Sequence, residues 1–482
     1  MPAAERILAV DIGTTTIKAV VFAVDGSIVR ATHVATDARG PAGGPGEQHP
    51  DAVVDGVLQA ITQILQEGGG NENIRALAFS SQLYSVLAVD EQDRPLGPSL
   101  TWADNRAADI SLAWRAEGLR LAEQTGCPPH SLYPLAKIAW MRRQPEYAKT
   151  KRFVSIKEYV IHRLAGEWLV DWQVASATGL LDVRAKTWCA PALDLAGIPA
   201  DALSSLVSPR TRLPAWTAEA LATGLPSETP GIIGGGDGPL GSLGLGAFAT
   251  DILSINVGTS AAGRCLLEQP ATDAQGRLWT YAVDDNLWVT GGIVSSGGAV
   301  FDWARRLAGN LSVEEALRAA AEVSHGADGL TFLPHLGGEQ SPGWNPRATG
   351  SLHGLTYRHG PAHLLRAALE GIARSLERVA STIVEVRRAP LVEARAAGGL
   401  SASSLWCRIA ADMLGLPLST GSSPEASARG AAMLALLALG DKRAWADFAD
   451  WCVAPVNTVS PDEAAHAFYA EQKATYLRMI SD

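Results

Sequence analysis

The chain alternates short apolar runs with longer segments in which apolar residues recur every three or four positions. Residues 7–11 and 17–24 are rich in Ile and Val and flank the polar sequence GTTT. Such runs predict two β-strands of a hairpin, joined by a glycine-led turn. In residues 51–66 the apolar positions fall on one face of a helix. Strand character returns at 74–79 and 85–89, so this part of the chain is predicted to mix strands with helices.

Two later segments have a helical spacing of apolar residues. One covers residues 156–164, and the clearest covers residues 361–388, which begins with a proline. Proline suits the first turn of a helix because the N–H that it lacks would have no partner there. We expect the second helix to pack behind a sheet, with an apolar stripe formed by Leu364, Ala368, Ile372, Leu376 and Val379.

The sequence contains a short internal echo. The segment NVGTS repeats the pattern of DIGTT, with Asn256 over Asp11, Gly258 over Gly13 and Thr259 over Thr14. Both copies follow a strand-like run, and they lie about half the chain apart. The echo predicts two domains of similar topology, residues 1–246 and 247–482.

The strongest change in composition falls at residues 231–248. Eight glycines occur between residues 231 and 246, interleaved with Ile and Leu. Such density marks either a flexible linker or backbone that approaches a ligand closely. A linker would be polar, so we expect this segment to be packed. It also contains Asp237, in the sequence GGGDG.

Composition and charge exclude several classes of protein. A chain of 482 residues is too long for one hydrophobic core. Its net charge of −10 argues against non-specific binding of nucleic acid. Five scattered cysteines without a CxxC pair favour reduced thiols over disulfides or a zinc site. No signal peptide and no membrane-spanning run are evident. We therefore expect a cytoplasmic protein that binds neither membrane nor nucleic acid, and a homodimer is left open.

The segment DIGTTTIK carries the first candidate chemistry. A turn of glycine and threonines presents N–H groups and hydroxyls to one side, which suits a phosphate. An aspartate just before the turn can hold Mg²⁺, a cation that prefers oxygen ligands. We therefore consider Asp11 for the metal and Thr14, Thr15, Thr16 and Lys18 for phosphate. An ordinary hairpin is the alternative, and no GxxxxGK[ST] loop is present.

Two further glycine motifs could hold a nucleotide. Gly258 and Thr259 form the second copy of the turn, and Gly398–Gly399 precede a predicted helix. Paired glycines at the start of a helix allow a flat ring or a phosphate to lie against bare backbone. A plain tight turn is the alternative for each motif.

The motifs together resemble the FGGY family of carbohydrate kinases. The resemblance covers essentially the whole chain and rests on DIGTTTIKAVVFAVDG, TWADNRA, GGGDG, NVGTS, GGEQSPGWNPRATG and AAGGLSASSLWCRIAADMLG. It implies an α/β protein of two actin-like (RNase H-like) domains with a catalytic cleft between them. It also implies ATP, Mg²⁺ and a small sugar or sugar-acid substrate, with the sugar bound by the N-terminal domain and the nucleotide by the C-terminal domain.

The resemblance assigns roles to individual residues. It implies that Asp237 is the catalytic base that accepts a proton from the substrate hydroxyl, and that Asp11 organises the magnesium. Such a base typically contributes roughly 10²–10⁴-fold in rate. The phosphate contacts implied are Thr14, Thr15, Gly258 and Thr259. The positions implied around the nucleotide are Gly298, Gly398, Gly399 and Ser403.

Within the family, the chain is most similar to gluconate kinases, with xylulokinases as near neighbours. The substrate contacts that this implies are Gln82, Leu83, Tyr84, Trp102, Asp104 and Arg106.

Two departures bear on which sugar is used. The substrate loop of both branches reads Met-His where this chain has Leu83 and Tyr84, and Gln340 stands where many relatives carry arginine. A gluconate carboxylate would need a cationic partner, for which Arg106 or Lys137 would have to serve. Gluconate ranks first, a ketopentose such as xylulose second, and an unusual polyol third.

A non-catalytic actin-like sensor is the alternative of another class. Such relatives often carry an N-terminal helix-turn-helix, whereas here the first predicted strand already begins at residue 7. The presence of Asp237 also favours an enzyme.

Overall fold

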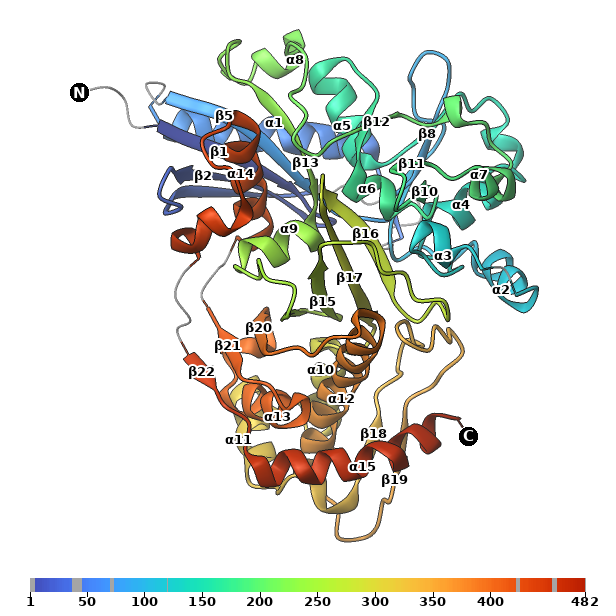
Figure 1. Ribbon diagram of the computed structural model, residues 1–482, viewed down its shortest axis with the longest axis vertical. Coiled ribbons are helices and arrows are strands. Elements are labelled where there is room, and N and C mark those ends of the chain that lie inside the picture. Colours follow the sequence, from blue (N-terminus) through green and yellow to red (C-terminus); the bar gives the residue numbers. More distant parts are fainter. Residues whose placement is uncertain are drawn as a thin grey trace. The chain divides into compact units, whose positions relative to one another are not determined.

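The computed structural model (Figure 1) describes residues 5–36, 46–69, 73–118, 120–421, 425–452 and 457–481. The chain divides into two compact units. Unit 1 comprises Met1–Phe248, Glu268–Val289 and Pro424–Cys452, and unit 2 comprises Ala249–Leu267, Thr290–Ser423 and Val453–Asp482. The division at 246/247 made from the sequence stays a prediction about domains, because the compact units are built from alternating stretches of chain.

Unit 1 is built on a five-stranded sheet in the order β13-β5-β1-β2-β3. The predicted hairpin is confirmed, since β1 and β2 pair antiparallel with Asp11 opposite Lys18. Strands β5 and β13 continue the sheet on the other side of β1, and both run parallel to it. The bounds are β1 Glu5–Ile12, β2 Thr16–Ala23, β3 Ile28–Ala35, β5 Asn73–Ser81 and β13 Gly231–Gly236.

Helices cover both faces of this sheet. Helix α1 (Pro50–Glu67), which the sequence predicted, packs with Leu8 and Val10 in one core cluster. The alternate residues Ile7 and Ala9 are equally buried, as expected when successive side chains point to opposite faces. Helix α14 (Ala426–Leu439) lies against β1 and β5, and Figure 1 shows it in front of the sheet with α1 behind.

Residues 84–225 of unit 1 form short helices and strands. The helices at 108–116, 134–141 and 190–196 share a second apolar cluster, whereas the helix at 156–165 packs into the core of the sheet. The predicted helix at 156–164 is confirmed as α5, which begins with a capping box between Ser155 and Glu158. The predicted strand at 85–89 is shorter, β6 (Leu87–Val89). The principal helices are α2 Ala108–Ala116, α4 Pro134–Met141, α5 Ile156–Ala165, α6 Trp172–Ser176 and α7 Ala190–Ala196.

The glycine-rich segment is packed, as the sequence predicted. Its first part is strand β13, which is entirely buried. Its second part is helix α9 (Asp237–Gly244), which packs on α14. A Cβ added to Gly244 would lie 1.9 Å from the Ala426 carbonyl oxygen, and one added to Gly430 would lie 2.1 Å from that of Leu240. Glycine therefore permits the two helix backbones to touch.

Unit 2 repeats the hairpin and its parallel neighbour. Strands β14 (Ile252–Val257) and β15 (Ala261–Leu267) pair antiparallel, and β20 (Glu393–Ala397) runs parallel to β14. This matches β1, β2 and β5, so the topology predicted from the echo is confirmed. The sheet continues through β21 (Leu418–Thr420) to β22 (Asn457–Val459), and β17 (Leu287–Val294), which enters from unit 1, lies beside β15.

The predicted long helix of unit 2 is α12 (Pro361–Arg387), and it packs on β15. In α13 (Ser404–Leu414) the buried residues include Trp406, Ile409 and Met413, whereas Leu405 and Leu414 are only half-buried. The other helices are α10 Gly298–Leu307, α11 Val313–Ala321 and α15 Glu463–Ser481.

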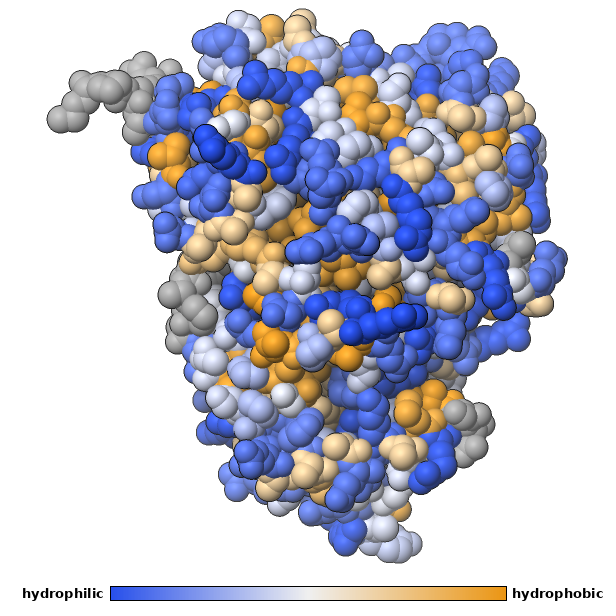
Figure 2. All heavy atoms as spheres, in the orientation of Figure 1, coloured by the Kyte–Doolittle hydropathy of each residue, from blue (hydrophilic) through white to orange (hydrophobic). Residues whose placement is uncertain are grey.

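Polar and apolar residues are interspersed over the face that Figure 2 shows. Among the described helices, none combines the length and the apolarity that crossing a membrane requires. None of the five cysteines forms a disulfide, and four of them are buried.

Candidate functional site

Three parallel strands of unit 1 end at the same edge of the sheet. Ile12 at the end of β1 lies beside Ser81 at the end of β5, and Ser81 lies beside Gly236 at the end of β13. Neighbouring strands are about 4.8 Å apart. Gln82 and Asp237, the residues that follow β5 and β13, therefore emerge close together. In open α/β sheets, ligands bind outside the carboxyl ends of such strands.

Asp11 lies on β1 at this edge, with Lys18 and Ser80 as its neighbours in register. Its Oδ1 is out of contact with solvent and accepts no hydrogen bond from the described residues. Burial raises the pKa of Asp11, the Ser80 hydroxyl and Lys18 lower it, and Glu425 raises it. A buried carboxylate oxygen without a donor is a site that a hard cation can occupy.

Lys18 is already paired within unit 1. Its Nζ lies 3.0 Å from Oε2 of Glu425, the residue that precedes α14. Oε1 of Glu425 lies 3.2 Å from Nε2 of His33. Glu425 was missed from the sequence, because it lies far along the chain in a segment without a recognisable motif.

A closed ring of hydrogen bonds surrounds Thr14. Its Oγ1 donates to Oε1 of Gln82 at 2.9 Å, and Nε2 of Gln82 donates to Oε1 of Gln48 at 2.6 Å. Nε2 of Gln48 donates to the Thr14 carbonyl at 2.8 Å, which closes the ring. Nε1 of Trp102 also donates to Thr14 Oγ1, at 3.2 Å. The structure thus joins Thr14, Gln82 and Trp102. Gln48 was not predicted, since no motif contains it.

The other two threonines of the turn have different surroundings. Thr15 is exposed, and its carbonyl accepts from the Thr36 N–H at 3.0 Å. The Thr16 carbonyl accepts from the Gly13 N–H at 3.2 Å, which closes the turn.

Asp104 and Arg106 are bonded to each other. Arg106 Nε donates to Asp104 Oδ2 at 2.6 Å, and Nη2 donates to Glu47 Oε1 at 2.6 Å. Burial would lower the pKa of Arg106, but Glu47 and Asp104 together raise it. The guanidinium also lies over the Trp140 ring, 5.1 Å from its centroid. The charge of Arg106 is therefore shared between two carboxylates.

The loop at 82–84, which the sequence predicted to contact the substrate, packs against several neighbours. Leu83 packs under β13, where a Cβ on Gly236 would lie only 2.4 Å from its Cδ2. Tyr84 has a left-handed backbone with φ of 70°. Its hydroxyl accepts from Tyr281 at 3.2 Å, and its ring meets Tyr133 edge-on at 5.8 Å. Tyr84 is thus part of an aromatic cluster, with its hydroxyl oriented by a second tyrosine.

Lys137 ties this loop to the Trp102 loop. Its Nζ donates to the carbonyls of Tyr84 at 3.0 Å, Thr101 at 2.6 Å and Leu132 at 3.0 Å. The side chain is fully buried, and burial lowers its pKa to about 7. Lys137 therefore holds backbone in place, and its ammonium group is not exposed to a ligand.

Asp237 is the first residue of α9 and is half-buried. Its Oδ1 accepts from the Gly238 N–H at 2.7 Å, and its carbonyl accepts from Ser427 Oγ at 3.0 Å. The N-terminal end of a helix favours negative charge. Behind it, the Gly236 N–H donates to Gln173 Oε1 at 3.0 Å, which fixes the end of β13.

The second turn lies in unit 2, where Gly258, Thr259 and Ser260 are all exposed. Its carbonyls accept hydrogen bonds from the start of α10. The Gly298 N–H donates to the Gly258 carbonyl at 2.7 Å, and the Ala299 N–H donates to the Thr259 carbonyl at 3.2 Å. The structure therefore brings Gly258, Thr259 and Gly298 together.

The glycine pair that follows β20 meets the same turn. Gly398 has φ of 96°, and a Cβ there would lie 2.4 Å from the Val257 carbonyl oxygen. A Cβ on Gly399 would have no atom within 4 Å, so this position faces open space. Ser403 caps α13 by accepting from the Trp406 N–H at 3.2 Å. Bare backbone thus lines the end of β14, as expected if a nucleotide lies against it.

Gln340 belongs to unit 2, whereas the six predicted substrate residues belong to unit 1. It is half-buried and follows Glu339, whose Oε1 accepts from Arg378 at 2.6 Å.

Comparison with known proteins agrees with this arrangement. The N-terminal domain of the FGGY family of carbohydrate kinases matches residues 6–244, and the C-terminal domain of the same family matches residues 253–439. A gluconokinase of Bacillus subtilis (strain 168) is 36% identical over 449 residues, which is 90% of this chain and 87% of that protein.

Two solved structures have the same fold. A gluconate kinase from Lactobacillus acidophilus has a TM-score of 0.94 and 29% identity, and covers 99% of this chain and 98% of its own. A ligand-bound xylulose kinase from the same organism also has a TM-score of 0.94 and 29% identity, with coverage of 98% and 97%. With both of its domains matched in order, the chain belongs to the FGGY family of carbohydrate kinases.

Proposed function

We propose that the protein transfers a phosphoryl group from ATP to a hydroxyl of gluconate. The observation that carries this proposal is the common edge of β1, β5 and β13, where Asp11, Gln82 and Asp237 emerge together. The relationship to a gluconokinase, 36% identical over 449 residues, supports the choice of substrate.

In the proposed reaction Asp237 is the general base. A sugar hydroxyl is a weak nucleophile, and a carboxylate within hydrogen-bond reach can accept its proton as the new O–P bond forms. Gln82 and Trp102 are proposed to bind the sugar hydroxyls, because Trp102 is 42% exposed beside the ring of hydrogen bonds around Thr14. Leu83, Tyr84, Asp104 and Arg106 complete the proposed sugar site.

Unit 2 is proposed to hold the nucleotide. The exposed turn of Gly258 and Thr259 offers backbone and hydroxyl groups to phosphate, while Gly298, Gly398, Gly399 and Ser403 leave room for the rest of ATP. In unit 1, Thr14, Thr15, Thr16 and Lys18 are proposed for the transferred phosphoryl group, with Lys18 kept in place by Glu425.

Asp11 is the residue that would hold Mg²⁺. The fit rests on its Oδ1, which is buried without a donor. Within the described ranges no group of three or more His, Cys, Asp or Glu side chains could enclose a metal. This agrees with the chemistry, because Mg²⁺ in kinases is bound by one or two carboxylates together with the substrate phosphates. When bound, the ion would neutralise phosphate charge.

A ketopentose such as xylulose is the second candidate. A gluconate carboxylate would require a cationic partner, but both cations considered for that role already have partners within the protein. Arg106 is bonded to Asp104 and Glu47, and Lys137 donates to three carbonyls while fully buried. A neutral sugar needs neither charge.

The test is a measurement of ADP release from the purified protein with ATP, Mg²⁺ and a panel of sugar acids, ketopentoses and polyols. Gluconate should give the highest kcat/KM. A higher value with xylulose would favour the second candidate, and no sugar-dependent turnover would favour a non-catalytic sensor.

The role of Asp237 is tested by Asp237→Asn, with Asp194→Asn on the exposed side of α7 as the control. Asp237→Asn should lower kcat roughly 10²–10⁴-fold, because it removes the base, and should leave ADP affinity unchanged. Retention of a tenth of wild-type turnover would contradict the assignment.

A further inference from the structure

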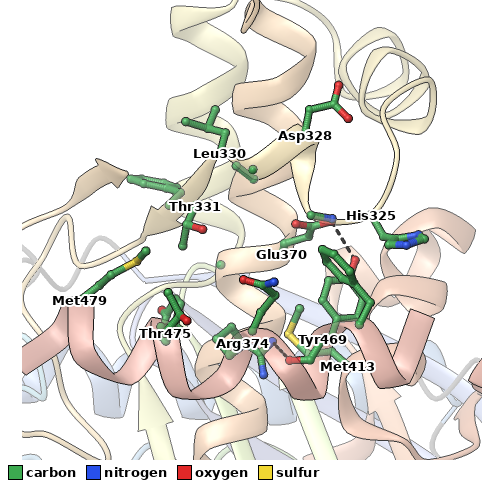
Figure 3. A pocket seen from close by; sticks show the side chains of 18 residues that line it. His325, Asp328, Leu330, Thr331, Glu370, Arg374, Met413, Tyr469, Thr475 and Met479 are labelled. Atoms are coloured by element: carbon green, nitrogen blue, oxygen red, sulfur yellow. Dashed lines mark hydrogen bonds between the residues drawn. The ribbon is translucent and has the colours of Figure 1, made fainter. Parts of the chain in front are cut away.

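Unit 2 contains a cavity of about 550 Å³, which none of the proposed nucleotide residues lines. Its walls are α12, α15 and residues 325–332, which include the short helix η3 (Ala327–Gly329) and the start of β18 (Thr331–Leu333). Figure 3 shows Glu370 and Arg374 on α12 facing Tyr469 and Thr475 on α15. Binding pockets for small molecules have volumes of roughly 300–1,000 Å³.

The cavity is separate from the proposed nucleotide site. Both touch α13, but at opposite ends: Ser403 caps the start of the helix, and Met413 near its end lines the cavity. At 1.5 Å per residue these positions are roughly 15 Å apart along the helix axis.

Residues 325–332, which line the cavity, are held in place by hydrogen bonds. The Asp328 carbonyl accepts from Arg358 Nη2 at 2.7 Å, and the Asp328 carboxylate lies 3.2 Å from Nε2 of His363. The Gly326 N–H donates to Glu370 Oε1 at 2.9 Å. In Figure 3 the Asp328 carboxylate points away from Glu370. The cavity is therefore formed by fixed contacts in the protein itself.

Much of the lining is aromatic or thioether. Phe468 and Tyr469 meet edge-on at 5.7 Å, and His325 meets Phe468 edge-on at 4.8 Å. Met413 and Met479 add polarisable sulfur. Aromatic faces and methionine sulfur pack well against a flat ring.

One carboxylate oxygen in the lining retains its capacity to accept. Glu370 is 9% exposed, and its Oε1 accepts from Arg366 Nε at 2.7 Å and Tyr469 Oη at 2.8 Å as well as from Gly326. Among the described residues none donates to its Oε2. A carboxylate oxygen that accepts from no protein group is free to accept from a donor on a ligand.

The charges near the cavity are balanced. Arg366 pairs with Glu370 at 2.7 Å, and Arg374 pairs with Glu377 at 3.2 Å. Both arginines therefore already have a carboxylate partner, which favours an uncharged ligand over an anion.

From these observations we propose that the cavity is a binding site for a flat, uncharged, amino-substituted heteroaromatic molecule of about nucleobase size. The ring lies among Phe468, Tyr469 and the two methionines, and the amino group donates to Glu370 Oε2. This site is separate from the proposed binding sites for the sugar and for ATP.

The test uses aminopyrimidine and pyrimidine as matched probes in ligand-observed NMR on the whole chain, with saturating ADP to fill the nucleotide site. Aminopyrimidine should bind saturably with a Kd on the order of 1 mM, as expected for a fragment of this size. Pyrimidine, which lacks the amino donor, should bind about tenfold more weakly.

Thr475→Trp fills the cavity from the half-buried face of α15, and Ala474→Trp puts the same ring on its exposed face. Thr475→Trp should weaken aminopyrimidine binding at least tenfold, and Ala474→Trp should not. Kinase turnover of both variants checks that they are folded. Equal binding in Thr475→Trp, displacement by ADP, or no saturable binding would each overturn the proposal without affecting the kinase assignment.

Discussion

The two glycine-threonine turns each join a pair of antiparallel strands, but their surroundings differ. In unit 1 the turn follows Asp11, whose Oδ1 is buried, and its first threonine is bonded into a ring with Gln82 and Gln48. In unit 2 the turn follows Asn256, and both Asn256 and Thr259 are exposed. The first turn therefore follows an acidic residue and is bonded to its neighbours, whereas the second follows a neutral residue and is exposed.

This difference suits two halves of one reaction. A buried carboxylate can organise a cation, while an open, neutral turn can receive phosphate without repulsion. The proposed function therefore assigns different tasks to the two turns, because the side chain before the turn and the packing around it differ.

Exchanging the charges should have the largest effect. Asp11→Asn should lower kcat roughly 100-fold at a fixed Mg²⁺ concentration, with partial recovery as Mg²⁺ rises, because a metal-organising group is removed. Asn256→Asp should leave kcat nearly intact and raise KM for ATP about fivefold, since a like charge near phosphate costs about 1 kcal/mol. Steady-state kinetics with varied Mg²⁺ and ATP would show both effects. Equal responses to the two variants would mean that the turns are equivalent.

The glycine pair beside the second turn offers a matched test of stability. Gly398→Ala should destabilise the protein by about 2 kcal/mol, because φ of 96° disfavours a side chain and its Cβ would lie 2.4 Å from a carbonyl oxygen. Gly399→Ala should be nearly neutral, since nothing lies within 4 Å. Urea unfolding measures both, and a destabilising Gly399→Ala would show that this position is not open.

The glycines of the two turns should respond differently to alanine. A Cβ on Gly13 would lie 2.6 Å from the Thr16 carbonyl oxygen, whereas on Gly258 the nearest atom is 3.9 Å away. Gly13→Ala should therefore cost about 1–2 kcal/mol of stability. Gly258→Ala should keep its stability and show a raised KM for ATP. Unfolding curves combined with ATP kinetics separate the two, and a stable Gly13→Ala would contradict the closed description of the first turn.

Replacing Lys137 should have a smaller effect, which is confined to KM for the sugar. Lys137→Met removes the donor shared by the Tyr84, Thr101 and Leu132 carbonyls. KM for the sugar should rise about fivefold, because the Tyr84 loop loses one of these three hydrogen bonds, which is worth about 1 kcal/mol, while KM for ATP stays constant. A change in KM for ATP instead would show a general loss of structure.

Lys137 should also make stability depend on pH. Its pKa in the folded chain is about 7, below the ordinary value of 10.5. Between these values the unfolded chain binds a proton that the folded chain does not, so the contribution of Lys137 to stability rises with pH. Urea unfolding at several pH values across this window should show that the free energy of unfolding of the wild type rises relative to that of Lys137→Met as the pH rises. A constant difference would mean that the pKa is not lowered.

Local patterns in the sequence predicted much of the fold. The alternation around GTTT predicted the β1–β2 hairpin, and helical spacing predicted α1, α5 and α12, because each depends on residues close together in the chain. The apolar residues among the glycines at 231–248 correctly indicated packing. The role of Asp237 comes from the resemblance to a family, whereas Asp11 was also indicated by its place before the GTTT turn, and both roles stay proposals.

Contacts between distant segments could not be predicted. Glu425 meets Lys18 because α14 returns to the first sheet, and Gln48 joins Thr14 from the two-residue strand β4 (Glu47–Gln48). Lys137 was considered as a partner for a substrate carboxylate, but burial and three carbonyl acceptors engage it within the protein.

The sequence by itself determined the class of secondary structure, the paired turns and the family, since these follow from local periodicity and from motifs. Only the tertiary structure decided which charges are paired, which oxygens lack a donor and where cavities lie. Those properties depend on solvent exclusion and on distances of a few ångströms between residues remote in sequence, and no local pattern encodes them.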